Sequence, residues 1–464
     1  MTTTVLRRAG AALALCVACI GNAWAFRDDT YHHDAVPLPA QSRWMSTLHD
    51  TTPLNALSVP GTHASAARHG GDDIASHVLT IRQQLDAGVR YLDLRAQLWW
   101  GNLALYHRNV SQQGSLHHAL KEITAFLAAN PSETVFVRLR EESVPHSTSA
   151  FFASALDRMY PEFGHWFAGP VKLDTPLGSL RGKIVLLRQY AGNTRFPAMD
   201  FARDFIVQEH WHVDSSWWLY RKWEAVKFQL DASNRLQGTL PFLNHLSGGG
   251  GVGPWFVASG HQNPRTDALP QGSGQWRPWS NPFPDFPTGA CVPFYIACEI
   301  NYEGINRMAT LAMRNNDALK YVGIVASDFP GSGLIAATID VNRTHAKFVS
   351  AKNGQCLDLE GGVHGRLITW PCHGAFNQRF TVRGTSIRVA GKCLDVTGGQ
   401  ATAPIILWSC HGGGNQQWRV EPNGMVRSLM GNQQLCLANV SGNRVELRQC
   451  NAGNTDQRFA SRQH

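Results

Sequence analysis

The sequence predicts an α/β protein in two parts, a TIM-like (β/α) barrel followed by a small all-β domain. Its 464 residues exceed one ordinary domain. Strand-like and helix-like stretches alternate between residues 54 and 341, a pattern typical of a parallel sheet closed as a barrel. After residue 346 a pattern of about 40 residues occurs three times. We therefore place the barrel domain at residues 26–343 and the all-β domain at residues 344–464.

The first 25 residues have the layout of a cleavable export signal. Two arginines precede the apolar run Ala11–Ile20, and residues 23–25 are Ala-Trp-Ala. The run is shorter than the roughly 20 residues that span a bilayer, which disfavours a membrane anchor. A lipid anchor on Cys19 is a further alternative. We expect a secreted protein, extracellular or periplasmic, whose mature chain begins near Phe26.

The net charge of the mature chain indicates which kinds of binding partner to expect. The signal contains two of the 42 basic residues and none of the 34 acidic ones, so the mature chain has a net charge of +6. This mild excess suits anionic surfaces such as lipid headgroups. Lysine and arginine are scattered without a nucleic-acid recognition motif, so we expect no nucleic-acid partner. We also expect a monomer.

The expected barrel elements follow from the spacing of apolar residues. The strand candidates are Ala56–Val59, Val89–Leu94, Ala104–His107, Thr134–Leu139, Lys183–Arg188, Phe205–Glu209, Pro241–Leu246 and Val322–Ala326. The helix candidates are Leu116–Ala129, Ser149–Asp157, Trp217–Leu236 and Ile305–Leu319. Catalytic groups of such barrels lie where strands end.

The ends of these strands contain many residues suited to catalysis. His63 follows the first strand, Asp93 and Arg95 follow in the second, and His107 ends the third. Later strand ends add a second group of polar and aromatic side chains: Arg140, Arg188, Glu209, Trp211 and Asp328. Histidines can act as base and acid near neutral pH, and a guanidinium binds phosphate, so the set suits phosphoryl chemistry.

Four segments of the barrel resemble the bacterial phosphatidylinositol-specific phospholipase C family. They are Pro60-Gly61-Thr62-His63, Gln83-Gln84-Leu85-Asp86-Ala87-Gly88, Arg90-Tyr91-Leu92-Asp93-Leu94-Arg95 and Asn130-Pro131-Ser132-Glu133-Thr134. The resemblance implies a phosphoric diester hydrolase or lyase that cleaves phosphatidylinositol lipids at a membrane surface. The products would be diacylglycerol and a cyclic inositol phosphate.

The same resemblance assigns roles to the strand-end residues. His63 would be the base, oriented by Asp328, and His107 would be the acid. Arg95 would bind the phosphate, and Asp93 on the same strand also belongs to the expected catalytic residues. The inositol ring would contact the remaining four residues: Arg140, Arg188, Glu209 and Trp211. Related calcium-dependent enzymes have an acidic metal ligand where this chain has Arg95, so we expect no metal and no cofactor.

One departure from the family pattern affects the acid. The family has Gly-Thr-His-Asp, whereas this chain has Ala64 after His63. Without that carboxylate His107 has no evident partner, although Asp72 or Asp73 could substitute. We expect slower turnover than the family norm, and a catalytically impaired binding protein stays an alternative.

Two other interpretations of the barrel residues stay open. His63 and His107 could be zinc ligands or core residues. A secreted glycoside hydrolase would use paired carboxylates from the set Glu141, Glu142, Glu209 and Asp328.

The three C-terminal repeats share a cysteine framework. Eight cysteines follow the signal, an even number that predicts four disulfides in an exported chain. Pairing within each repeat joins Cys356 to Cys372, Cys393 to Cys410, and Cys436 to Cys450. Each such loop is worth about 3 kcal/mol in the chain-entropy model. Cys291 and Cys298 form the fourth expected pair.

The repeat motifs resemble the ricin B-type lectin, a three-lobed β-trefoil. The resemblance implies a sugar site in the first repeat at Asp358, Trp370 and Asn377. A second site would lie at Asp395, Trp408 and Asn415, whereas the third repeat has Ala438 and no site. Turn formation is the alternative for the two aspartates. Gln378, Gln416 and Gln457, with the aromatic residues after them, are expected to fill the trefoil core.

Aromatic residues crowd a stretch rich in glycine and proline before Cys291. They are Trp276, Trp279, Phe283 and Phe286. Insertion into a lipid interface and burial against the barrel are equally compatible with the pattern.

Overall fold

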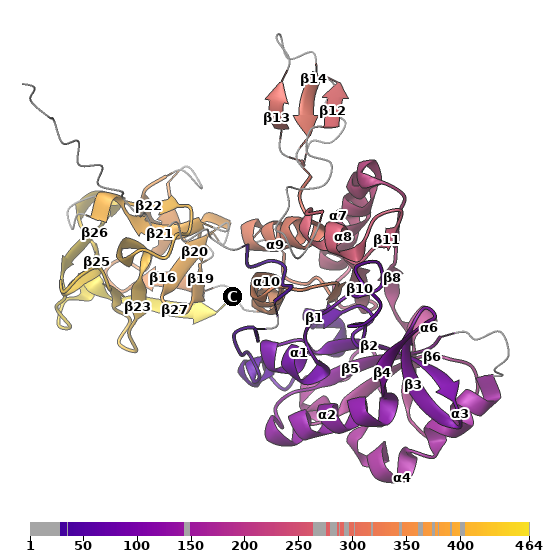
Figure 1. Cartoon of the computed structure of the whole chain (residues 1–464). Coiled ribbons are helices and arrows are strands. Elements are labelled where there is room, and N and C mark those ends of the chain that lie inside the picture. The colour runs from indigo at the N-terminus through magenta and orange to yellow at the C-terminus, as the bar shows by residue number, and fades with distance from the viewer. Residues whose placement is uncertain are drawn as a thin grey trace, which may run out of the picture.

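The computed structural model describes residues 28–463 apart from residues 35, 143–148, 263–274, 279–284, 287, 292–296, 301, 317–318, 343–345, 361–364, 374–375, 379, 390–391 and 400–403. The expected export signal and the expected domain boundary after residue 343 lie outside the described residues. Figure 1 shows the barrel and the C-terminal domain as separate units.

Eight parallel strands form the main sheet in the order β7-β6-β5-β2-β1-β15-β10-β8. Their bounds are β1 Val59–Thr62, β2 Tyr91–Trp99, β5 Val135–Glu141, β6 Ile184–Gln189, β7 Ala198–Asp200, β8 Ile206–Gln208, β10 Phe242–His245 and β15 Ile324–Ser327. Figure 1 shows the strands curving around a centre with helices outside them. The hydrogen-bonded order ends at β7 and β8 among the described residues, so this TIM-like barrel is open there.

Helices cover the outside of the sheet. They are α1 Ile81–Ala87, α2 Leu116–Ala129, α3 Ser149–Asp157, α4 Tyr160–Phe163, α5 Leu177–Leu180, α6 Phe201–Asp204, α7 Leu219–Arg235, α8 Pro254–Ser259, α9 Ile305–Asn315 and α10 Ser332–Val341. The bounds of α2 and α3 agree with the sequence prediction. The Ser115 side chain accepts a hydrogen bond from the His118 N–H and so begins α2. Apolar faces of these helices pack on the strands.

Most predicted strands are shifted by one or two residues, β2 extends five residues beyond its predicted end, and two further strands differ in position or pairing. The first strand begins at Val59 because residues Leu54–Ala56 form a 3-10 turn. The predicted strand near residue 104 is β3 (Asn102–His107), which pairs antiparallel with β2 and with β4 (Val110–Ser115) outside the parallel order. Trp100 and Gly101 join β2 to β3 with φ of 48° and 79°, the conformation of a two-residue hairpin turn.

The cysteine-containing segment before α9 forms a small antiparallel sheet in the order β12-β14-β13. Its strands are β12 Gln275–Pro278, β13 Thr288–Cys291 and β14 Ala297–Ile300, and Figure 1 shows them extending away from the barrel. Cys291 and Cys298 are register partners. Their side chains lie outside those described, so this disulfide stays a prediction.

The C-terminal domain is built from three four-stranded antiparallel sheets, one for each repeat. The strands are β16 Ala346–Ser350, β17 Cys356–Leu359, β18 Leu367–Trp370, β19 Thr381–Arg383, β20 Ser386–Val389, β21 Lys392–Val396, β22 Ile405–Trp408, β23 Trp418–Val420, β24 Val426–Ser428, β25 Leu435–Asn439, β26 Val445–Gln449 and β27 Phe459–Gln463. The first sheet includes β27, so the end of the chain closes the domain. This arrangement confirms the expected trefoil.

One disulfide forms within each repeat, as expected. Cys356 bonds to Cys372, Cys393 to Cys410 and Cys436 to Cys450. Such bonds persist in oxidising compartments. No helix of the described part of the chain has the length and apolar character needed to cross a bilayer.

Candidate functional site

A pocket of about 350 Å³ opens at the carboxyl ends of the parallel strands. His63, Arg95, His107 and Asp328 all line it, as the sequence predicts. They come from the ends of β1, β2, β3 and β15. The barrel therefore brings together four side chains that are separated by up to 265 positions in the chain.

His63 is held on both ring nitrogens. Its Nδ1 lies 2.8 Å from Asp328 Oδ1 and its Nε2 lies 2.7 Å from Arg95 Nη2. A guanidinium can only donate, so Nε2 accepts and the ring proton is on Nδ1, where it is donated to Asp328. The backbone carbonyl of His63 also accepts a 2.6 Å hydrogen bond from His77 Nε2. The ring is thus oriented as a neutral base.

The loop after β1 is fixed by α1. Thr62 Oγ1 donates to Gln84 Oε1 at 2.8 Å, and Gln84 Nε2 donates to the Ser65 carbonyl at 2.8 Å. Gln84 belongs to the motif before Arg90, so this segment supports the position of His63. Arg90, in contrast, pairs with Glu133 in a fully buried ion pair away from the pocket.

Asp93 lies beneath the pocket and binds three groups through one oxygen. Its Oδ2 accepts from the Ala64 N–H at 3.0 Å and from Arg95 Nη2 at 3.0 Å, and lies 3.6 Å from Arg138 Nη1. Although burial alone would raise it, the two guanidinium groups hold the pKa of Asp93 well below its usual range. The carboxylate is therefore ionised and ties β1, β2 and β5 together.

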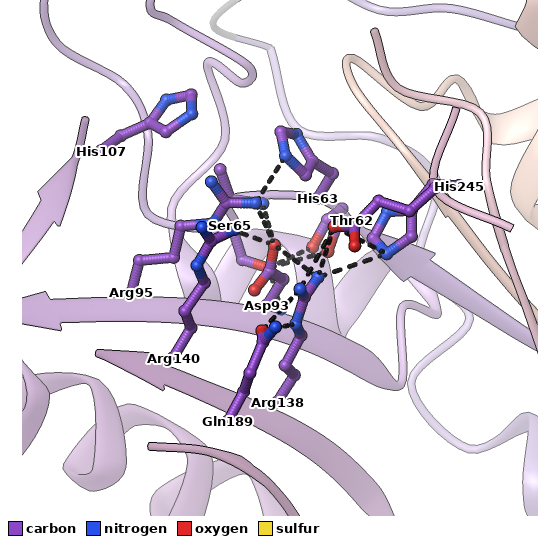
Figure 2. A network of polar contacts seen from close by, with 12 residues as sticks. Thr62, His63, Ser65, Asp93, Arg95, His107, Arg138, Arg140, Gln189 and His245 are labelled. Carbon is purple, nitrogen blue, oxygen red and sulfur yellow. Dashed lines mark hydrogen bonds and ion pairs between the residues drawn. The ribbon is translucent and has the colours of Figure 1, made fainter. Parts of the chain in front are cut away.

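Arg138 is a buried functional residue that the sequence reasoning missed. Figure 2 shows its guanidinium between Gln189, Asp93 and His245. It donates to Glu209 Oε1 at 3.1 Å and to Gln189 Oε1 at 2.6 Å. Its Nη1 lies 3.3 Å from His245 Nε2, and the His245 ring is 5.8 Å from the His63 ring. Arg138 and Arg140 lie two positions apart on β5 and therefore on the same face of the strand. This shared face was the signal in the sequence that could have identified Arg138.

His107 faces His63 across the pocket, with ring centroids 5.7 Å apart. Its Nδ1 lies 2.9 Å from the Ile74 carbonyl, which can only accept, so Nδ1 has a proton. The expectation that His107 lacks a partner in the absence of a carboxylate at position 64 is therefore wrong, because a backbone carbonyl takes that place. Asp72 and Asp73 are exposed. Nε2 is the nitrogen left to transfer a proton.

Burial shapes the protonation of the pocket. Burial, reinforced by the Arg95 guanidinium, lowers the pKa of His63 well below its usual range. Burial, reinforced by the Arg95 guanidinium, lowers the pKa of His107 to about 3. Burial raises the pKa of Asp328 to about 6 despite the cations near it. At pH 7 both histidines are therefore neutral and Asp328 is ionised.

The pocket wall includes three of the four predicted inositol-binding residues. Arg140, Glu209 and Trp211 line it together with Glu142, which the sequence reasoning named only for a glycoside hydrolase. Glu142 Oε1 lies 3.6 Å from Arg95 Nη1 and Glu142 Oε2 lies 3.6 Å from Arg140 Nε. The structure does not bring Arg188 to the pocket, because its Nε lies 3.6 Å from Asp200 on β7.

The C-terminal domain has two matching polar sites. In the first repeat Asp358 accepts hydrogen bonds from Asn377 Nδ2 at 2.9 Å and from Gln378 Nε2 at 2.7 Å. His373 Nε2 lies 3.1 Å from the same carboxylate. Trp370 ends the adjacent strand and is 49% exposed. The side chains therefore form a polar group beside an open aromatic face.

The second repeat reproduces this arrangement. Asp395 accepts from Asn415 at 2.9 Å and from Gln416 at 2.7 Å, and His411 Nε2 lies 3.3 Å away. Trp408 is 58% exposed. Both aspartates lie within strands, β17 and β21, so a turn-forming role does not apply.

The third repeat lacks these groups. Ala438 and Asn451 replace the aspartate and the histidine, whereas Gln457 remains buried and donates to the Gln449 carbonyl. The aromatic residues Phe380, Trp418 and Phe459 are buried in the core as expected. The glutamines are therefore shared scaffold residues, and two of them also hold the aspartates.

The described residues contain no group of three or more histidine, cysteine, aspartate or glutamate side chains placed to bind a metal ion. The predicted metal independence rests on Arg95 and stays a prediction.

Family models match both parts of the chain. The model described as PI-PLC X 1 matches residues 54–160, and the ricin-type beta-trefoil lectin domain matches residues 344–459. The first match includes His63, Arg95 and His107, and the second covers both polar sites of the trefoil.

Comparison with known proteins agrees with the barrel match. A 1-phosphatidylinositol phosphodiesterase of Listeria monocytogenes is 32% identical over 229 residues, which cover 44% of this chain and 68% of that protein. A Staphylococcus aureus protein of the same name is 25% identical over 159 residues, covering 32% and 51%. The solved phosphatidylinositol-specific phospholipase C of L. monocytogenes covers 66% of this chain and 99% of its own, with 24% identity and a TM-score of 0.49.

Replacing Arg138 tests how much this residue contributes to the stability of the protein. Arg138→Gln would leave Asp93 as a buried charge with one cation fewer, and we expect the free energy of unfolding to fall by about 3 kcal/mol or more. Arg188→Gln is the matched control on the next strand, because its pair with Asp200 is partly exposed and worth at most about 1 kcal/mol. Urea unfolding of both variants makes the comparison, and equal stability would contradict the role given to Arg138.

Proposed function

The chain belongs to the 1-phosphatidylinositol phosphodiesterase family, and from this we propose that it cleaves phosphatidylinositol-type lipids with His63 as base and His107 as acid. The strongest support is that the His63 and His107 rings lie 5.7 Å apart in the same pocket, with the Arg95 guanidinium hydrogen-bonded to His63. The products would be diacylglycerol and a cyclic inositol phosphate.

Phosphate binding would free the base. In the empty pocket Arg95 donates to His63 Nε2, and an anionic phosphodiester is a stronger acceptor for the same guanidinium. Once Arg95 turns to the phosphate, Nε2 can take the proton of the neighbouring inositol hydroxyl. That oxygen attacks phosphorus as the proton leaves. Asp328, 2.8 Å from Nδ1, stabilises the imidazolium that forms.

Departure of diacylglycerol needs a proton from His107. As the phosphorus–oxygen bond to diacylglycerol breaks, His107 Nε2 would donate a proton to the leaving oxygen. The pKa of His107 is lowered to about 3 in the empty pocket, so this ring must gain its proton with the substrate. The negative phosphodiester offsets the charge of Arg95 and raises the proton affinity of His107. Substrate binding and protonation of the acid are therefore coupled.

The pocket wall would recognise the inositol ring. Glu209, 3.1 Å from Arg138, and Glu142, near Arg95 and Arg140, can accept hydrogen bonds from ring hydroxyls. Trp211 is 51% exposed at the same wall and offers a face for the ring. A glycoside hydrolase would need two carboxyl groups facing a sugar, whereas Glu142 lies beside Arg95 and Arg140 and Glu209 is bound by Arg138.

The C-terminal domain would bind glycans through its first two repeats. Asp358 and Asp395 are aimed by asparagine and glutamine side chains, each beside an exposed tryptophan. Two sites on one domain would raise the avidity for a glycan-coated surface. We further propose that the protein is a monomer and that it is secreted, in keeping with the three disulfides of the described residues and the expected export signal.

The activity is tested by release of water-soluble inositol phosphate from labelled phosphatidylinositol. We expect release by the wild-type protein, a loss of at least about 10²-fold in His63→Ala, and unchanged rates in excess chelator. A rate lost in chelator and restored by calcium would contradict metal independence. Equal rates in the wild type and in His63→Ala would contradict the assignment of the base.

The pH dependence of kcat/KM reports Asp328. Its pKa is raised to about 6, so the carboxylate is ionised above this pH and becomes neutral as the pH falls through it. We expect the ratio of wild-type to Asp328→Asn kcat/KM to fall about tenfold per unit below pH 6, because the wild type loses its counter-charge there whereas proton uptake by His107 is common to both proteins. Above pH 6 Asp328→Asn should be slower than wild type. A ratio that does not change with pH would refute the explanation.

Ala64 provides a test of the acid. Its φ of 43° lies in the left-handed region, which aspartate and asparagine tolerate better than alanine. A carboxylate near His107 favours its protonated form, so Ala64→Asp should raise kcat, by about tenfold out of the 10² to 10⁴ available to general acid–base catalysis. Ala64→Asn is the uncharged control. Equal or lower rates for the aspartate variant would show that the Ile74 carbonyl already suffices.

Glycan binding is tested in the full chain on a glycan array. Asp358→Asn and Asp395→Asn should each weaken binding, and the double variant should abolish it. Glu446→Gln is the control, because this residue faces Ala438 in the third repeat. Binding that survives in the double variant would place the sugar site elsewhere.

A further inference from the structure

Two adjacent exposed tryptophans form the tip of the β2–β3 hairpin. Trp99 is 54% exposed and Trp100 is 88% exposed. Other large exposed apolar residues of the described chain, such as Phe228 and Leu236 on or next to α7, do not form such an adjacent aromatic pair. Trp211, Trp370 and Trp408 are accounted for by the sites above. The hairpin tip therefore needs a separate explanation.

The backbone at the tip makes the choice of tryptophan unusual. Trp100 has a φ of 48°, and a bulky residue is uncommon in this left-handed region, where asparagine and glycine are favoured. The Trp100 side chain makes few contacts that could repay this strain, since it is almost fully exposed. A strained residue retained at an exposed turn is a marker of function.

The tip lies on the element that contains the catalytic cation. Arg95 and Trp99 are four positions apart on β2, which places the tip roughly 13 Å beyond Arg95 at ordinary strand rise. β2 pairs with β5 up to Ala96 and then continues only with β3. His107 ends β3. The hairpin therefore continues β2 past the pocket, with its tip at the opposite end of β3 from His107, which lines the pocket.

Its surroundings combine cationic and apolar character. Arg158 donates a hydrogen bond to the Gly101 carbonyl, which holds a guanidinium at the tip. The helix α3 packs against β2 and β3 and exposes Phe151. Tryptophan prefers the boundary between water and hydrocarbon, and basic side chains beside it suit anionic headgroups.

We propose that the β2–β3 hairpin is a membrane-docking element that inserts Trp99 and Trp100 into the interface of the bilayer that contains the substrate. The inference rests on the proposed function, because only a lipid substrate requires the pocket to meet a bilayer. Docking at the tip would hold the mouth of the pocket near the headgroups, while Arg95 and His107 stay with the barrel. Of the aromatic residues expected to insert or be buried near residues 276–286, Phe286 is buried against Tyr302, and the side chains of Trp276, Trp279 and Phe283 lie outside those described.

The test uses the full chain and a double variant chosen to fold. Trp99→Thr suits a strand, and Trp100→Asn suits a positive φ. Binding is measured by sedimentation with phosphatidylcholine vesicles containing phosphatidylinositol, which present no glycan to the trefoil. Activity is measured on the same vesicles and on short-chain phosphatidylinositol below its micelle concentration. Phe228→Ala, an exposed aromatic on α7, is the control.

We expect the double variant to lose about tenfold or more in vesicle partitioning and in activity on vesicles. Its kcat/KM on monomeric short-chain lipid should stay within about twofold of wild type, and Phe228→Ala should match wild type throughout. Unchanged partitioning would overturn the proposal, as would an equal loss on both substrates, which would place the effect in the pocket. Wild-type failure on short-chain lipid would contradict the proposed function instead, since partitioning is measured independently of cleavage.

Discussion

The arrangement of the side chains in the pocket depends on the buried carboxylate of Asp93. One of its oxygens accepts from the backbone N–H that follows His63, accepts from Arg95 and lies beside Arg138. These partners belong to three neighbouring strands, so their relative positions are set by a single group. An isolated buried carboxylate is costly, and two guanidinium groups offset that cost. The same pairing keeps Arg95 directed at His63, as Figure 2 shows.

Arg95 is the pocket cation suited to an anionic phosphodiester. The guanidinium groups of Arg95, Arg138 and Arg140 each lie near a carboxylate, that of Asp93, Glu142 or Glu209. The low pKa of His63 and of His107 follows from burial, reinforced by the charge of Arg95. A bound phosphodiester would reverse that depression and so link binding to protonation of the acid. The trefoil would hold the protein at a glycan-coated surface, and the tryptophan hairpin would hold it at the bilayer. Neither would contact the reacting atoms.

Sequence patterns predicted the architecture and most of the site. Strand–helix alternation and the threefold cysteine repeat define the two domains, and four strand-end residues do converge in one pocket. Arg138 escaped notice because it lies inside β5, on the same face as Arg140 but two positions earlier, whereas the sequence argument considered only strand ends. Arg188 was misplaced because a strand end can face a neighbouring strand instead of the pocket. The Ile74 carbonyl that holds His107 is a backbone group, which no residue pattern reveals.

The most direct test is the protonation and tautomer of His63, measured by nitrogen-15 NMR of labelled histidine rings at pH 7. The account predicts a neutral ring with its proton on Nδ1 in the wild type, because Nε2 accepts from Arg95. Asp93→Asn should shift the Nε2 signal by releasing Arg95 from its orientation. A charged ring, or a neutral ring with the proton on Nε2, would contradict the network described above.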